Sequence, residues 1–217
     1  TLNKEIKTFS LMILNLFVRT LALNITLYYA SAFSTSYGKE YIAAYTIAIN
    51  LWFLGAFIID GYSSAGNILS GKLFGQENYQ ALLRLSSKLI KYGIILGISM
   101  AIIGGLFYEI IGTVFTKDPK VLHEFYQVFW IILLMQPLCA LAFIFDGVFK
   151  GLGKMKYLRN VLLFSTFMVF LPLLFWLDSM NYKLYGIFIA ITGWIVARGV
   201  PLIIKFRQQF LPLSQKV

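Results

Sequence analysis

The sequence has few charged residues, nine acids among them, and it holds one cysteine and one histidine. Charged residues make up 13% of its 217 positions, whereas a water-soluble domain carries about a quarter because its surface must be hydrated. This shortage excludes a soluble globule. The single Cys139 lies inside an apolar stretch, so no disulfide framework is expected. The single His123 excludes a multi-histidine metal site, and we expect neither a metal nor another cofactor.

Apolar residues are abundant and lie in long stretches. They make up 59% of the chain, and the mean hydropathy is +0.77. Crossing a bilayer as a helix takes roughly 20 residues, whereas a membrane β-barrel would alternate apolar and polar residues in shorter segments. We therefore predict an all-α fold, a polytopic bundle of six transmembrane helices embedded in a lipid bilayer. The six predicted spans are Phe9–Phe33, Tyr41–Leu69, Tyr92–Ile111, Val121–Phe149, Val161–Trp176 and Leu184–Phe206.

The basic residues alternate between rich and poor links and so orient the bundle. The net charge of +10 comes from 19 Lys and Arg, which sit in short links rather than on one basic face, so no nucleic-acid partner is expected. Basic residues gather on the cytoplasmic side of membrane proteins, which predicts that both termini are cytoplasmic. One side carries Lys4, Lys7, Lys72, Arg84, Lys88, Lys91, Lys150, Lys154, Lys156, Arg159, Lys205, Arg207 and Lys216, and the other Lys39, Lys117, Lys120 and Lys183.

The link between the second and third predicted spans, Ser70–Lys91, has two features of its own. The run Gly71-Lys72-Leu73-Phe74-Gly75 is expected to break the second helix. Leucines then alternate with basic residues, which predicts an amphipathic start to the next element, as in a helix lying along the membrane interface. A solvated basic loop that sets only the topology is the alternative.

Four ionisable residues lie inside predicted spans, where charge is costly: Arg19, Asp60, Asp146 and Arg198. Arg19 follows Lys7 by 12 residues and Asp60 precedes Lys72 by 12 residues. This spacing predicts that Arg19 and Asp60 lie at similar depths in the membrane, where they can face each other as a pair. Asp146 and Arg198 are expected nearer the cytoplasmic ends, as a second pair. Such pairs can serve structure alone. Alternatively, a desolvated carboxylate can take up a proton near neutral pH and couple ion flow to transport.

Uncharged polar residues in or near the spans form a second set of candidates. Asn15 and Arg19 are four residues apart and share one helix face, and Gln136 precedes Pro137, which weakens the surrounding backbone ladder. Hydrogen bonds between helices account for most residues of this kind. The alternative is that they line a cavity for a substrate. The candidates are Asn15, Asn24, Asn50, Gln127 and Gln136.

Arrangements typical of enzymes are missing. His123, on the charge-poor side, offers no serine–histidine pair. Asp60 and Asp146 each precede a glycine, as in membrane aspartyl proteases, but the expected Gly-x-Gly-Asp element is absent because Lys154 follows Gly151-Leu152-Gly153. The two aspartates are also expected at different depths. We predict that the chain is not an enzyme.

Several motifs carry a family resemblance. Ile58-Ile59-Asp60-Gly61-Tyr62 and Ser70-Gly71-Lys72-Leu73-Phe74-Gly75 resemble the eighth helix and its cytoplasmic exit in the multidrug and toxic compound extrusion (MATE) family. Phe145-Asp146-Gly147-Val148-Phe149, with Leu158-Arg159-Asn160, resembles the link between the tenth and eleventh helices in the family's DNA-damage-inducible F (DinF) branch. Ala197-Arg198-Gly199 is similar to its last helix.

The resemblance covers residues 1–217 as one six-helix lobe, the C-terminal half of a protein about twice as long. The opening Thr1-Leu2-Asn3-Lys4-Glu5 has neither an initiating Met nor a cleavable signal peptide. Processing, or a place within a longer polypeptide that supplies the missing N-terminal lobe, would account for this start.

The resemblance implies a function. Members of the family are two-lobed secondary transporters of the inner (plasma) membrane that export drugs and organic cations by antiport with H⁺ or Na⁺. Asp60, Arg19, Asp146 and Arg198 would be polar positions of the second lobe. The first predicted span holds Arg19 and no carboxylate, which disfavours a sodium site in this lobe. Two alternatives stay open: a flippase for lipid-linked sugars and a structural membrane subunit that transports nothing.

Overall fold

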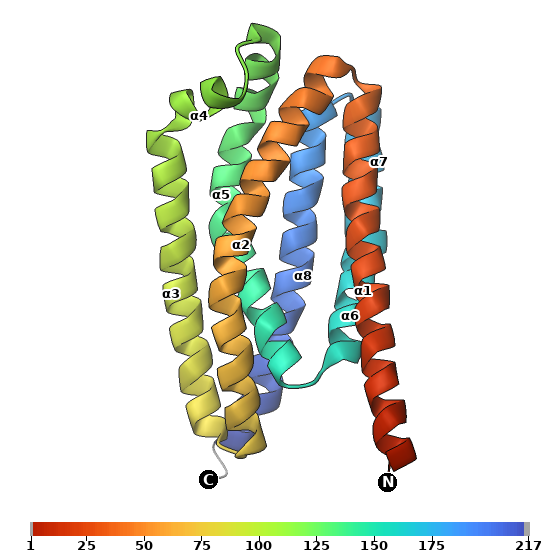
Figure 1. The fold of residues 1–217 in the computed structure, drawn as a ribbon, viewed down its shortest axis with the longest axis vertical. Coiled ribbons are helices and arrows are strands. Elements are labelled where there is room, and N and C mark those ends of the chain that lie inside the picture. Colours follow the sequence, from red (N-terminus) through yellow and green to blue (C-terminus); the bar gives the residue numbers. More distant parts are fainter. Residues whose placement is uncertain (1, 215–217) are drawn as a thin grey trace.

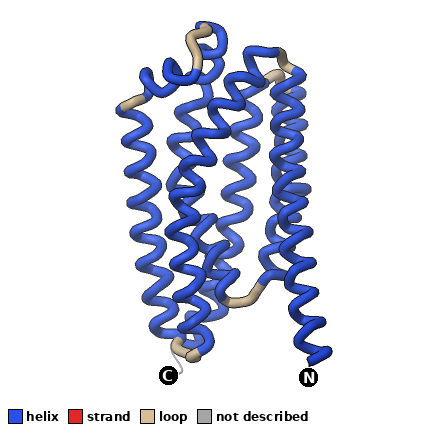
Figure 2. The backbone as a smooth tube through the Cα atoms, in the orientation of Figure 1, coloured by secondary structure: helices blue, strands red, loops and turns tan. Residues whose placement is uncertain are grey.

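The computed structural model describes residues 2–214, and these residues form helices joined by short connections (Figure 2). Side chains are described from residue 6 onward. The elements are α1 (Leu2–Ser36), α2 (Lys39–Gly75), α3 (Tyr79–Leu106), α4 (Tyr108–Phe115), α5 (Pro119–Gly151), α6 (Met155–Phe164), a π-helical segment η1 (Ser165–Phe170), α7 (Leu171–Ser179) and α8 (Lys183–Ser214).

Six helical segments within residues 2–214 are long and apolar enough to cross a membrane. Five of them are α1, α2, α3, α5 and α8, and the sixth is the continuous run Met155–Ser179 that joins α6, η1 and α7. The described part of the chain has no strand. The predicted all-α bundle of six spans is therefore confirmed. Because the number of spans is even, α1 begins and α8 ends at the same end of the bundle (Figure 1).

The core of the bundle forms around α5, which packs against α2, α3 and α8. Its large side chains are fully buried, among them Phe125, Ile132, Phe145 and Phe149. By contrast, α1 and α2 meet at the link that holds Tyr37 and Gly38, and they diverge toward the opposite end (Figure 1). In this view α8 lies between the diverging ends of α1 and α2 (Figure 1).

Small residues let α2 and α5 approach closely. A Cβ atom on Gly147 would lie 2.6 Å from the backbone oxygen of Ser63, and one on Gly151 would collide with the backbone oxygen of Asn67. The hydroxyl of Ser63 donates a 2.7 Å hydrogen bond to the carbonyl of Phe143. Close contact between small residues is a usual source of stability for helices in membranes. Here it fixes the depth and rotation of α5 next to Asp146.

The link between the second and third spans agrees with the expectation in part. The helix α2 ends at Gly75, the last residue of the run expected to break it, but it continues through Gly71, and α3 begins at Tyr79 and runs unbroken. Gly71 does not break the helix because it lies against the backbone of Gly151, where a Cβ would be 3.0 Å from the carbonyl oxygen. The segment is the expected amphipathic start of the next element, but it does not form a separate interface helix, because it is the first part of α3 and buries Leu82 and Leu89 against the bundle. Lys216, which contributed to the predicted orientation, lies outside the described residues.

The third span also ends earlier than Ile111. The helix α3 stops at Leu106, and the short α4 turns back toward the start of α5. The Tyr108 hydroxyl donates to the carbonyl of Tyr126, and the Tyr126 hydroxyl donates to the carbonyl of Glu109, both at 2.6 Å. These reciprocal bonds tie α4 to α5.

Candidate functional site

A cavity of about 180 Å³ lies between α1, α2, α5 and α8. The sequence singled out four intramembrane charges, and all four line this cavity, together with one lysine. Aromatic side chains supply much of the remaining wall. We call this cavity the charged pocket. Its charged residues are Arg19, Asp60, Asp146, Lys150 and Arg198, and its aromatic residues are Trp52, Phe53, Phe57, Phe143 and Trp194.

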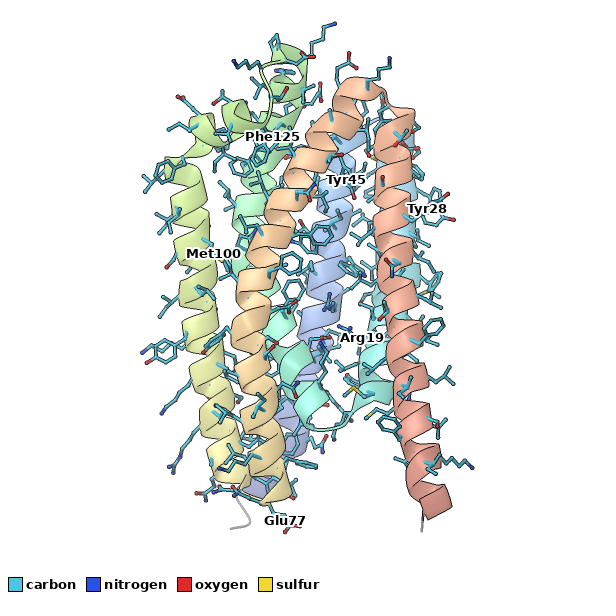
Figure 3. All side chains as sticks on the ribbon, in the orientation of Figure 1. Arg19, Tyr28, Tyr45, Glu77, Met100 and Phe125 are labelled. Atoms are coloured by element: carbon cyan, nitrogen blue, oxygen red, sulfur yellow. The ribbon has the colours of Figure 1, made fainter. Side chains whose placement is uncertain are left out.

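Asp146 is the centre of the charge network. Nη2 of Arg19 lies 2.7 Å from Oδ1 and 2.6 Å from Oδ2 of Asp146. Nζ of Lys150, one helical turn further along α5, lies 2.9 Å from Oδ2, and Nη2 of Arg198 lies 3.6 Å from Oδ1. Figure 3 labels Arg19 on the side of α1 that faces α8. One buried carboxylate thus joins α1, α5 and α8.

Both arginines are buried, and each keeps a free N–H group. The side chains of Arg19 and Arg198 are 11% and 6% exposed. The Nε atom of each has no hydrogen-bond acceptor among the described residues. The Arg198 guanidinium lies 4.9 Å from the ring centre of Phe143 and 5.3 Å from that of Trp194, and such cation–π contacts offset part of the cost of burying the charge.

Asp60 lines the same pocket without a partner in the network. It is exposed, and its carboxylate forms no ion pair among the described residues, whose ion pairs all involve Asp146. Its backbone carbonyl accepts a 2.8 Å hydrogen bond from the Ser64 hydroxyl. Asp60 is therefore an exposed carboxylate, free of ion pairs among the described residues, in the lining of a pocket that holds three basic side chains.

These positions correct the predicted pairing. Arg19 binds Asp146 and not Asp60, whereas the expected contact between Asp146 and Arg198 is present as the longest of the three ion pairs. The expected difference in depth between Asp60 and Asp146 is also wrong, because both line one pocket. The reason is that the α5–α6 connection is recessed: it lies nearer the middle of the bundle than the α2–α3 connection (Figure 2). Counting from the nearest lysine therefore misjudged the depth of Asp146.

Buried hydrogen bonds hold the pocket residue Trp194 in place. Trp194 donates from Nε1 to Oγ1 of Thr166 at 3.1 Å, and Thr166 lies 3.2 Å from Oγ1 of Thr26. Thr166 belongs to η1, the π-helical segment that packs against α1 and α8. Because π-helical turns redirect side chains and often occur at functional sites, η1 helps to hold Trp194 beside Arg198.

Two of the predicted uncharged candidates lie on α1. Oδ1 of Asn15 accepts a 2.6 Å hydrogen bond from Arg159 Nη1, which ties α1 to α6. Asn24 is exposed, and its amide donates to the carbonyl of Thr20 at 2.9 Å. Neither lines the charged pocket.

The other three candidates also lie outside the charged pocket. Asn50 is exposed on α2 and donates to its own helix, at the carbonyl of Thr46. Gln127 contacts His123 at 2.8 Å near the start of α5. Gln136 is buried on α5, where it lines a separate cavity between α2 and α3, and its Oε1 has no partner among the described residues. The role of these three residues in binding a substrate stays a prediction.

Sequence reasoning missed Lys150, which it placed among the loop charges. The signal was present, because Asp146 and Lys150 are four residues apart, the spacing of ion pairs on one helix face. It also missed Thr26, Thr166 and Trp194, which carry no signal of their own until the helices are placed side by side. No group of three or more His, Cys, Asp or Glu that could hold a metal ion occurs within the described chain.

The fold is that of one lobe of a membrane transporter. A Vibrio cholerae MATE transporter, VcmN, in its bent form aligns with a TM-score of 0.86 and 14% identity, over 99% of this chain and 49% of that one. A MOP superfamily transporter from Pyrococcus furiosus, described as having a binding pocket of reversed polarity, aligns with a TM-score of 0.86 and 17% identity. That match covers 97% of this chain and 48% of the other.

Sequence comparison gives the family. A family model described as MatE matches residues 9–176, so the chain belongs to the MATE family. Protein DETOXIFICATION 42 of Arabidopsis thaliana is 28% identical over 184 residues, which are 85% of this chain and 35% of that protein. The chain thus spans about half the length of the solved structures and about a third of this relative. MATE proteins are membrane transporters and not enzymes, and this chain is a multi-pass membrane protein.

Proposed function

We propose that these residues form one lobe of a secondary active transporter that exports drugs or organic cations in exchange for an inward flow of H⁺. The observation that carries this proposal is Asp60, an exposed carboxylate, free of ion pairs among the described residues, in the lining of the charged pocket. A second lobe of the same polypeptide would close the pocket from the side where α1 and α2 diverge. Rocking of the two lobes would then expose the pocket to each side of the membrane in turn.

The coupling step depends on one negative charge. An organic cation bound at Asp60 is stabilised by the ionised carboxylate, and a proton bound at Asp60 removes that charge. The two ligands therefore exclude each other, which is the requirement for antiport. Asp146 cannot take this role in the described arrangement, because Arg19 and Lys150 occupy both of its oxygens.

The wall around Asp60 suits an organic cation. Phe53 and Phe57 lie on the same helix, with stacked rings whose centres are 6.3 Å apart, and Phe57 is 70% exposed. Aromatic faces attract cations and also bind the apolar parts of drug-like molecules. We expect the cargo to lie against these two rings with its positive group toward Asp60.

The donor groups favour H⁺ over Na⁺ as the coupling ion. A hard metal cation takes several oxygen ligands, and Asp60 supplies the one carboxylate of the pocket that is free of ion pairs. A proton needs a single oxygen. The expected cellular setting follows the resemblance: the plasma membrane, with both termini in the cytoplasm and, among MATE proteins, the DinF-like branch.

A phosphate-bearing cargo, as in a flippase for lipid-linked sugars, is the second candidate. It is favoured by the excess of three basic over two acidic side chains in the pocket and by the free Nε groups of Arg19 and Arg198. The Pyrococcus furiosus transporter with a pocket of reversed polarity has the same overall fold. For this cargo the two arginines, and not Asp60, would hold the substrate.

The test uses the natural polypeptide that contains these residues, reconstituted in liposomes. We expect a fluorescent organic cation to move against an imposed pH gradient and to stop moving when the gradient is collapsed. Movement of the dye driven by a sodium gradient alone would show that the coupling ion is Na⁺ and not H⁺. Movement of a lipid-linked sugar without movement of the dye would favour the second candidate, and no movement of either would indicate a structural subunit.

A further inference from the structure

A second cavity, of about 340 Å³, lies at the recessed connection between α5 and α6. Three lysines line it, and it shares no lining residue with the charged pocket. We call it the lysine pocket. Its lining residues are Phe149, Lys154, Lys156, Tyr157, Asn160 and Lys205.

No acidic residue lines the lysine pocket. From residue 147 to residue 217 the sequence contains one acid, Asp178. Asp178 lies near the α7–α8 link, at the other end of the bundle, where it accepts a 2.5 Å hydrogen bond from the Tyr37 hydroxyl. None of the three lysines forms an ion pair among the described residues. A cluster of like charges without a carboxylate is stabilised when an anion binds to it.

Two further features point to an anion. The helix α6 starts directly after Lys154, and no side chain caps its first turn, so free N–H groups and the positive end of the helix dipole lie at the lysine pocket. Burial and the neighbouring charge of Lys205 lower the pKa of Lys154. A bound phosphate group would offset that repulsion.

The surroundings favour a lipid over a soluble ion. Phe149 and Tyr157 stack with ring centres 5.5 Å apart and form an aromatic wall. Ile204, beside Lys205, is 50% exposed on the outside of the bundle, where acyl chains lie. Basic pockets between helices at the end of the spans are typical sites for anionic headgroups.

We propose that the lysine pocket binds the phosphate group of an anionic phospholipid from the leaflet on the basic side of the membrane. The helix N-terminus and Lys156 and Lys205 hold the phosphate, and the lipid chains lie along α8 beside Ile204. This site is independent of the cargo and of the coupling ion. It anchors the α5–α6 connection, which carries the network around Asp146 a few residues earlier.

The test measures lipid retention by native mass spectrometry on the natural polypeptide in liposomes of equal phosphatidylglycerol and phosphatidylcholine. We expect preferential retention of phosphatidylglycerol. Each lysine near an anionic surface strengthens binding about fivefold, so Lys154→Gln, Lys156→Gln and Lys205→Gln together are expected to reduce retention roughly 100-fold.

The matched control is the triple variant Lys72→Gln, Lys88→Gln and Lys91→Gln, which removes the same charge from exposed positions of α2 and α3. It should retain phosphatidylglycerol like the unaltered protein. Because Lys154 also donates to Gln209, the double variant Lys156→Gln and Lys205→Gln tests the site without that contact. Equal loss in both triple variants, or no loss in the double variant, overturns the proposal.

A separate arm distinguishes the source of the phosphate group. Inorganic phosphate is added to the protein in phosphatidylcholine alone, and its binding is followed by the phosphorus resonance. Saturable binding there, combined with equal retention of the two lipids in the mixed liposomes, would identify a site for soluble phosphate and overturn the lipid proposal.

Discussion

One guanidinium nitrogen of Arg19 on α1 binds both carboxylate oxygens of Asp146 on α5, 127 residues further along the chain. The helix α1 lines the charged pocket with Arg19, and it diverges from α2 toward the end of the bundle where the chain begins (Figure 1). The contact therefore holds a peripheral helix to the core of the lobe. It also pairs the Asp146 carboxylate with a positive charge, so that Asp60 remains the one carboxylate of the pocket without an ion pair.

Replacing Asp146 by Asn should destabilise the fold. The change leaves Arg19, Lys150 and Arg198 close together without the carboxylate that balances them, and removing one partner of a buried ion pair costs roughly 3–5 kcal/mol. We expect a clear fall in the thermal unfolding midpoint of the purified protein in detergent. An Asp146→Asn protein as stable as the original would show that the network does not hold the helices.

A double-mutant cycle separates the Arg19–Asp146 contact from the rest of the network. Arg19→Met and Asp146→Asn are made alone and together. Because each single change strands the other partner, the double variant should lose less stability than the sum of the two single losses, by about 0.5–3 kcal/mol. Simple additivity would place the stabilising contact elsewhere, with Lys150 or Arg198.

The sequence predicted the spans well and the charge pairs poorly, for different physical reasons. A span is a local property, because each backbone group must be satisfied within its own helix and the apolar length is visible in the residues. The partner of Arg19 depends on how far each helix projects beyond the membrane. Asp146 lies five residues before the end of α5 at Gly151, yet it reaches Arg19 because the α5–α6 connection is recessed.

The same limit applies to glycine. Gly71 and Gly75 predict a helix break, and α2 does end at Gly75, but Gly71 stays helical and faces the backbone of Gly151 across the α2–α5 contact. Nothing in the sequence around Gly71 indicates which helix lies opposite. Residue type alone singled out Asp60 and Asp146, whereas depth counted from the nearest lysine separated them, so that their place in one pocket and their different partners required the positions of the helices.

Gly147→Ala should disturb the α2–α5 contact. The added methyl would lie 2.6 Å from the backbone oxygen of Ser63, and forcing extra volume into a packed contact costs about 1–3 kcal/mol. The measurement is the unfolding midpoint together with transport, since a shift of α5 also moves Asp146. Gly61→Ala is the control, because no atom lies within 4 Å of its added methyl. Equal effects of the two changes would contradict the close approach described here.

Tyr37→Phe tests the far end of the lobe. The Tyr37 hydroxyl donates a 2.5 Å hydrogen bond to Asp178 and so joins the α1–α2 link to the end of α7. Loss of a hydrogen bond to a charged group costs about 1.5–3 kcal/mol, so the variant should unfold at a lower temperature. Transport coupling should be unchanged, because Tyr37 does not line the charged pocket. A loss of coupling at unchanged stability would refute this assignment.

Asp60→Asn should abolish gradient-driven export while leaving the fold intact. Asp60 is exposed and takes no part in the ion pairs around Asp146, so its neutralisation removes the coupling charge without stranding a buried partner. The expected result is normal expression and a normal unfolding midpoint, with transport no longer responding to the pH gradient. Asp60→Glu, which keeps the carboxylate, is the matched control and should retain part of the activity.

Proton release on cargo binding tests the central claim most directly. A saturating organic cation such as tetraphenylphosphonium is added to the purified natural polypeptide in weakly buffered detergent solution, and released protons are measured with a pH indicator. At a pH where Asp60 is protonated, competition for its single charge predicts release of about one proton per bound cation. Asp60→Asn should release none and Asp60→Glu should release protons. Equal release from the Asp60→Asn protein and the unaltered protein would contradict the account.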